Sequence, residues 1–172
     1  MKLFNSMHNE IETIQPLIEN EISMYVCGPT VYNDAHVGNA RPIIVFDTLK
    51  KTLEELGYKV RFVSNYTDVD DKIINKAKEL QVAEKEVSER FIEAYQKVRT
   101  QLHADTPDAC PRVTQTMDEI IDFIDLLVKN NYAYAVDGDV YFRVSAVTDY
   151  GCLSNQQIQD LQVGARIDEN TK

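Results

Sequence analysis

The spacing of apolar residues in the first part of the chain predicts a strand, a helix and a second strand. A short apolar run over residues 24–27 stops at a Gly-Pro pair, as a buried strand does where it enters a loop. Apolar residues then recur every three or four positions, the period of a helix with one buried face: Ile43, Phe46, Leu49, Leu53 and Leu56. Gly57 follows as a C-terminal cap, and residues 59–66 read as the second strand. A segment of this length predicts a crossover unit with parallel strands.

Two more amphipathic helices are predicted over residues 70–80 and 84–102, where apolar positions again repeat with the helical period. Residues 105–111 then carry two prolines and several turn formers, which indicates a break in the chain. We therefore place a boundary between residues 111 and 112.

Beyond that boundary the pattern predicts a helix, a hairpin and a polar tail. The apolar stripe of the helix lies within residues 117–128. The hairpin is centred on Asp137-Gly138, because both central positions of a tight hairpin turn require positive φ. From residue 149 the chain is polar and has little periodicity. The predicted fold class is α/β, with one domain over residues 1–111 and another over residues 112–172.

Composition narrows the class of protein. The 172 residues are 44% hydrophobic, which is enough for a buried core, and no run approaches the roughly 20 apolar residues of a membrane span. The net charge of -10 argues mildly against binding a polyanion. Three cysteines lie far apart, so a disulfide framework is not indicated. These features predict a soluble, cytoplasmic protein without a membrane partner.

Residues 27–41 hold the candidate chemistry. They lie between the first strand and the long helix, where an open α/β sheet binds ligands and the free N–H groups of the helix favour anions. Within them, His36 and Asn39 can donate hydrogen bonds to phosphoryl oxygens, Gly38 allows close approach, and Arg41 adds positive charge. The alternative is that His36 is only a polar cap on the helix or a surface residue.

Three motifs follow one another along the chain. The first is Tyr-Val-Cys-Gly-Pro-Thr-Val-Tyr at 25–32, followed by His-Val-Gly-Asn-Ala-Arg at 36–41. The second is Asn-Tyr-Thr-Asp-Val-Asp-Asp-Lys-Ile-Ile at 65–74, and the third is Asp-Leu-Gln-Val-Gly-Ala-Arg at 160–166. In this order they resemble the signatures of the cysteinyl-tRNA synthetases, a family of class I aminoacyl-tRNA synthetases. In that family the His-Ile-Gly-His motif of class I commonly has Asn at its last position.

The resemblance implies roles for particular residues. His36 and Asn39 would be the catalytic pair that stabilises the triphosphate while cysteine attacks the α-phosphate. The implied ATP site comprises Pro29, Thr30, His36, Gly38 and Asn39, with Gly38 accommodating the adenosine.

Three further residues would bind the substrate amino acid. Cys27 is implied as one ligand of a zinc ion that binds the substrate thiolate, a soft ligand that separates cysteine from serine. Gly28 and Thr67 match positions that line the pocket. For Thr67, and for the three aspartates that follow it, helix capping before Ile73 is an equal alternative.

The resemblance also implies an overall interpretation. Residues 1–111 would be the first half of a Rossmann-like catalytic domain, and residues 112–172 the start of its connective insertion. The function implied is ATP-dependent ligation of L-cysteine to its tRNA through a cysteinyl adenylate, by a monomer that uses magnesium with ATP and one zinc ion. The other zinc ligands and the Lys-Met-Ser-Lys-Ser loop of the family do not occur in these residues, so we expect a truncated chain that is inactive alone. The alternatives are the cysteine ligase of mycothiol synthesis and a non-catalytic nucleotide-binding module.

Overall fold

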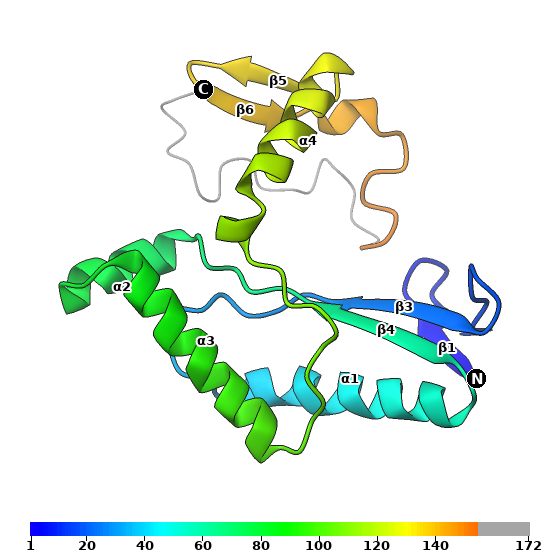
Figure 1. The fold of residues 1–172 in the computed structure, drawn as a ribbon. Helices are drawn as coiled ribbons and strands as arrows, with labels where there is room; N and C mark the ends of the chain where they lie inside the picture. The colour runs from blue at the N-terminus through cyan, green and yellow to red at the C-terminus, as the bar shows by residue number, and fades with distance from the viewer. Residues whose placement is uncertain (155–172) are drawn as a thin grey trace. The chain divides into compact units, whose positions relative to one another are not determined.

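The computed structural model describes residues 1–154, which belong to two compact units. One unit spans residues 16–119, and the other joins residues 1–15 to residues 120–154. In chain order the strands and α-helices are β1 (Lys2–Asn5), β2 (Glu10–Thr13), β3 (Glu21–Val26), α1 (Val37–Glu55), β4 (Lys59–Ser64), α2 (Asp71–Leu80), α3 (Glu84–Gln101), α4 (Met117–Lys129), β5 (Ala133–Val136) and β6 (Asp139–Phe142) (Figure 1). The motif at 160–166 and most of the predicted polar tail lie outside the described residues.

The predicted crossover unit is confirmed. β3 and β4 pair in parallel, from Glu21 opposite Lys59 to Val26 opposite Ser64, and α1 connects them (Figure 1). β3 begins earlier than the predicted apolar run. Every second side chain of this strand is exposed, and the prediction missed the start of the strand because its first exposed positions are polar. The apolar run therefore marked only the end of the strand.

The core of this unit gathers side chains from α1, α2, α3 and the loops after β3 and β4. Its buried members are Val31, Ile43, Tyr66, Ile73, Ala77, Val87, Phe91, Ile92 and Tyr95. Within the predicted stripe of α1, Ile43 and Leu53 are buried, but Leu56 is 55% exposed because the helix ends at Glu55. Gly57 follows with φ +89°, as expected for a residue that ends a helix.

The predicted break near residue 105 is an extended segment that runs beside β4. Ser64 N–H donates to the Ala109 carbonyl at 3.1 Å, and Tyr66 N–H donates to the Pro111 carbonyl at 2.8 Å. Arg99 is buried nearby, and its guanidinium donates to the Asp105 carbonyl at 2.8 Å. This segment thus extends the pairing of β4, and the division into domains at residue 111 remains a prediction.

The described residues of the other unit form two antiparallel hairpins. β5 and β6 flank Asp137 and Gly138, whose φ values of 51° and 96° confirm the predicted turn. The β1–β2 hairpin was not predicted, because its strands are short and mix polar with apolar residues. Among residues 1–154, no helix combines the length and apolarity needed to cross a membrane.

Candidate functional site

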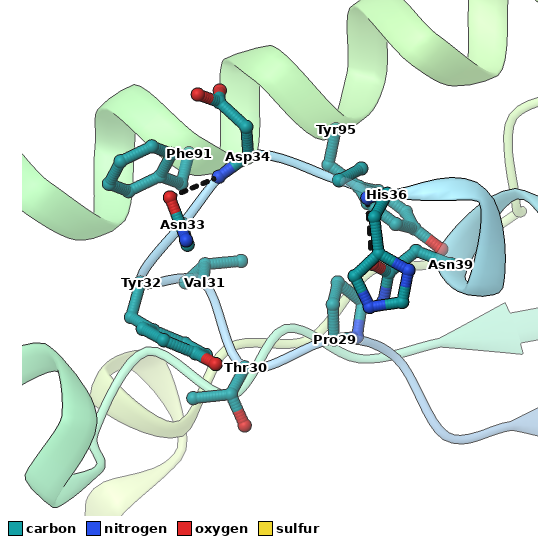
Figure 2. Close-up of a pocket in the computed structure, with 11 residues that line it drawn as sticks. Pro29, Thr30, Val31, Tyr32, Asn33, Asp34, His36, Asn39, Phe91 and Tyr95 are labelled. Atoms are coloured by element: carbon teal, nitrogen blue, oxygen red, sulfur yellow. Dashed lines mark hydrogen bonds between the residues drawn. The ribbon is translucent and has the colours of Figure 1, made fainter.

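A pocket lies between the loop that follows β3, the start of α1 and one face of α3. Figure 2 shows His36 and Asn39 on one side of it and Tyr32 on the other, with Tyr95 and Phe91 contributed by α3. Pro29 and Thr30 also line this pocket, so the structure brings together four of the five predicted ATP-binding residues. Gly38 and Arg41 are not among the lining residues.

His36 is held in place as the N-cap of α1. Its Nδ1 accepts the N–H of Gly38 at 2.9 Å, and its own N–H donates to Oδ1 of Asn39 at 3.1 Å, so the two side chains form a reciprocal capping box. Because Nδ1 accepts, the proton of the neutral ring is on Nε2, which remains available as a donor. The capping alternative therefore holds for His36, and it leaves one ring nitrogen for a ligand.

Gly38 is required by the position of the His36 ring. A Cβ at residue 38 would lie 2.5 Å from Cε1 and 2.9 Å from Nδ1 of that ring. The absence of a side chain thus lets the imidazole fold over the first turn of the helix. That Gly38 also accommodates adenosine remains a prediction.

The ends of β3 and β4 meet through Asn65. Its Oδ1 accepts the Gly28 N–H at 2.8 Å and the Tyr25 hydroxyl at 2.9 Å, and its Nδ2 donates to Oγ1 of Thr67 at 3.3 Å. Its backbone carbonyl lies so close to Gly28 that an added Cβ would be 1.7 Å away. Asn65 therefore connects both predicted amino acid pocket residues, Gly28 and Thr67. Sequence reasoning missed this role, although its place directly after a strand was a signal.

Thr67 is fixed to the pocket loop by its backbone. Its N–H donates to the Pro29 carbonyl at 3.1 Å, and its carbonyl accepts the Val31 N–H at 3.2 Å. Cys27 is the first residue after β3, on the segment that leads into this pairing. Gly28 and Thr67 are thus connected through Asn65, and Cys27 directly precedes Gly28, though the specific role of each residue remains a prediction.

Comparison with known proteins identifies the family. Residues 13–172 match the family model described as tRNA synthetases class I (C) catalytic domain. The chain belongs to this family. It is 51% identical over all 172 residues to the cysteine–tRNA ligase of Listeria welshimeri, and 49% identical to those of Anoxybacillus flavithermus and Geobacillus sp.. The chain spans 36% to 37% of the length of these relatives.

The three aspartates of the second motif have different roles in this class I domain. Asp70 is the N-cap of α2, since its Oδ1 accepts the Lys72 N–H at 2.9 Å. Asp71 is the first residue of that helix. Asp68 is buried and accepts both the N–H and the hydroxyl of Thr114, at 3.1 and 2.5 Å. Capping thus explains Asp70, whereas Asp68 joins the loop after β4 to the segment before α4.

Of the three cysteines, Cys152 is exposed and lies outside the three motifs, whereas Cys27 belongs to the first motif. Its thiol is exposed, whereas Cys110 is half-buried and burial raises the pKa of the Cys110 thiol, which disfavours the thiolate. One thiolate does not make a zinc site, and in the described part of the chain no group of three potential ligands includes Cys27. Residues 1–154 therefore do not by themselves fit a zinc ion, and a metal-binding role for Cys27 remains a prediction.

Within residues 1–154, the one group of three side chains with metal-ligand spacing lies on the β1–β2 hairpin and comprises His8, Glu10 and Glu12. The two carboxylate oxygens of Glu12 are already paired with Asn5 and His8. The hydrogen bond from Asn5, followed by that from His8, lowers the pKa of Glu12. We assign no metal to this exposed group.

Proposed function

We propose that these residues form the ATP and cysteine binding part of an enzyme that ligates L-cysteine to its tRNA through a cysteinyl adenylate. The observation that carries the proposal is the capped start of α1, which holds the His36 ring in the wall of a pocket whose loop pairs with the backbone of Thr67. A donor fixed in advance stabilises charge that develops on a phosphoryl oxygen without reorganisation. Identity of about half of all positions to cysteine–tRNA ligases supports the choice of substrates.

Each side chain of the pocket has a distinct task in this proposal. His36 donates to the phosphoryl oxygens of ATP, and Asn39 keeps the helix start and the His36 backbone in place. The backbone pairing of Thr67 with Pro29 orders the loop on which the amino acid lies. Magnesium would accompany ATP, and the Asp34 carboxylate in the pocket lining is an oxygen ligand of the kind that magnesium binds.

Cysteine is the proposed amino acid because Cys27 offers an exposed thiol at this edge of the sheet. In the proposed enzyme Cys27 contributes one soft ligand to a zinc ion, whose other ligands lie outside residues 1–154. A bound thiolate would distinguish cysteine from serine. The alternative function, that of the cysteine ligase of mycothiol synthesis, would use the same residues. The names of the similar proteins favour tRNA as the acceptor of cysteine.

Charging of tRNA tests the proposal. The chain is joined to the remaining part of the Listeria welshimeri ligase, of which it matches 36%, in place of the corresponding residues. This chimaera should attach radioactive cysteine to a tRNA transcript for cysteine, and not to a transcript for another amino acid. A folded chimaera that forms no cysteinyl-tRNA would contradict the proposed function.

Replacement of Cys27 by serine should distinguish a role of Cys27 in zinc binding from a role in the fold. Serine keeps the size of the side chain but lacks the soft donor, so we expect the zinc content of the chimaera to fall and its preference for cysteine over serine to drop about tenfold or more. Zinc is measured by mass spectrometry and preference by pyrophosphate exchange. Cys110→Ser is the matched control and should change neither. Unchanged zinc and unchanged preference in Cys27→Ser would rule out the assigned role.

A further inference from the structure

The pocket beside His36 has few groups that can balance the charge of a triphosphate. Its lining residues include one carboxylate, on Asp34, and neither lysine nor arginine. Two of the N–H groups at the start of α1 are already used, since those of His36 and Gly38 donate within the capping box. Polyphosphates are normally bound with cationic side chains in addition to helix N-terminal N–H groups. A lysine or arginine close to the lining residues would supply this charge.

Two cations lie against aromatic residues of this lining: Arg90, whose guanidinium is 5.2 Å from the ring of Phe91, its own neighbour in α3, and, from a different element, Lys72 of α2. Its Nζ lies 5.3 Å from the centroid of the Tyr32 ring, and Tyr32 is a residue of the pocket wall (Figure 2). The lysine stands in the first turn of α2, where its backbone N–H is bound by Asp70. The loop that carries Thr67 leads directly into this turn, so the position of Lys72 is tied to the same edge of the sheet.

The ammonium of Lys72 is held only by an aromatic face. Within residues 1–154, the ion pairs involve other lysines, and none includes Lys72: Lys50, Lys51, Lys59, Lys76 and Lys129. An exposed cation–π contact is weak, and a lysine side chain has four rotatable carbons in its stem. The ammonium can therefore leave Tyr32 for a stronger partner without breaking a salt bridge.

We propose that Lys72 binds the phosphates of ATP, moving from the face of Tyr32 to the phosphoryl oxygens when the nucleotide enters the pocket. This inference rests on the proposed function, because it assumes that the pocket takes ATP. It adds a cation from α2 to the donors that the start of α1 provides. Tyr32 acts as a positioning residue that holds the ammonium at the rim while the pocket is empty.

The test uses the 172-residue chain and three probes: ATP, inorganic tripolyphosphate and adenosine. Binding is followed by calorimetry for the wild-type chain, for Lys72→Met and for Lys76→Met. Lys76 is the matched control, since it lies one turn further along α2 and is paired with Glu79 at 3.1 Å. Circular dichroism and urea unfolding confirm that the variants remain folded.

Loss of one surface cation is expected to weaken binding of ATP and of tripolyphosphate about fivefold, and to leave adenosine unchanged. Lys76→Met should match the wild-type chain, and Lys72→Arg should restore most of the affinity because it keeps the charge. Equal ATP binding by wild type and Lys72→Met would overturn the inference and leave the proposed function intact. A wild-type chain that binds neither ATP nor tripolyphosphate would also overturn the inference, whereas the proposed function is decided separately by the charging assay of the chimaera. An equal loss in Lys76→Met would show an effect of net charge alone and also overturn the inference.

Discussion

Replacement of His36 by alanine is expected to slow adenylate formation by the chimaera about 10²- to 10³-fold, which is the usual effect of removing one donor to a developing charge. The affinity for cysteine should change much less, because His36 faces the phosphates in the proposed complex. The rate is measured as cysteine-dependent exchange of pyrophosphate into ATP. The substitution also removes the N-cap of α1, which costs about 1 kcal/mol of stability.

A second substitution at the same position separates donation from capping. Asparagine is a good N-cap, so His36→Asn should recover most of the lost stability while the Nε2 donor is still absent. If the hydrogen bond from Nε2 to the phosphates matters, both variants form the adenylate slowly and only His36→Ala is destabilised. Recovery of the wild-type rate in His36→Asn would show that His36 acts through the helix alone. His8→Ala, which removes an exposed histidine from the β1–β2 hairpin, serves as the control and should leave the rate unchanged.

A methyl group at Gly28 is expected to destabilise the unit of residues 16–119 by about 3 kcal/mol. The added Cβ would lie 1.7 Å from the Asn65 carbonyl oxygen, and this contact is with backbone rather than with the end of a flexible side chain. Relief requires β3 and β4 to separate where the Gly28 N–H is bound by the Asn65 side chain. Urea unfolding of the 172-residue chain, followed by circular dichroism, measures the change.

Gly57→Ala is the matched control for this steric argument. Gly57 has φ +89° and no atom within 4 Å of an added Cβ, so alanine there is strained by backbone conformation alone. That strain costs about 1 to 2 kcal/mol. A loss in Gly28→Ala that is no greater than the loss in Gly57→Ala would contradict the close approach of Gly28 to Asn65.

The parts of the fold that sequence predicts well are those with local causes. The helical period from Ile43 to Leu53 and the positive φ of Gly57 are set by residues close together in the chain, and both occur in the structure. The turn at Asp137 and Gly138 is a further local feature. Local patterns therefore gave the crossover unit and the second hairpin of the described residues.

Pairings between distant segments were not predictable in the same way. The residues around Ala109 resemble a loop because of their prolines, yet they pair with Ser64 of β4. Asn65 and Gly28 are 37 residues apart, and the place of Asn65 directly after a strand does not identify the Gly28 N–H as the group that its side chain binds. The motifs named some members of the candidate site, and the structure adds Phe91, Tyr95 and the contacts made by Asn65.

The most direct test of the central claim is pyrophosphate exchange by the folded chimaera with each amino acid in turn. If residues 27–41 and 65–74 form the ATP and cysteine site, cysteine should support exchange, serine should support little, and the activity should depend on His36. Exchange that requires a different amino acid, or that persists in full after His36→Ala, would contradict the account.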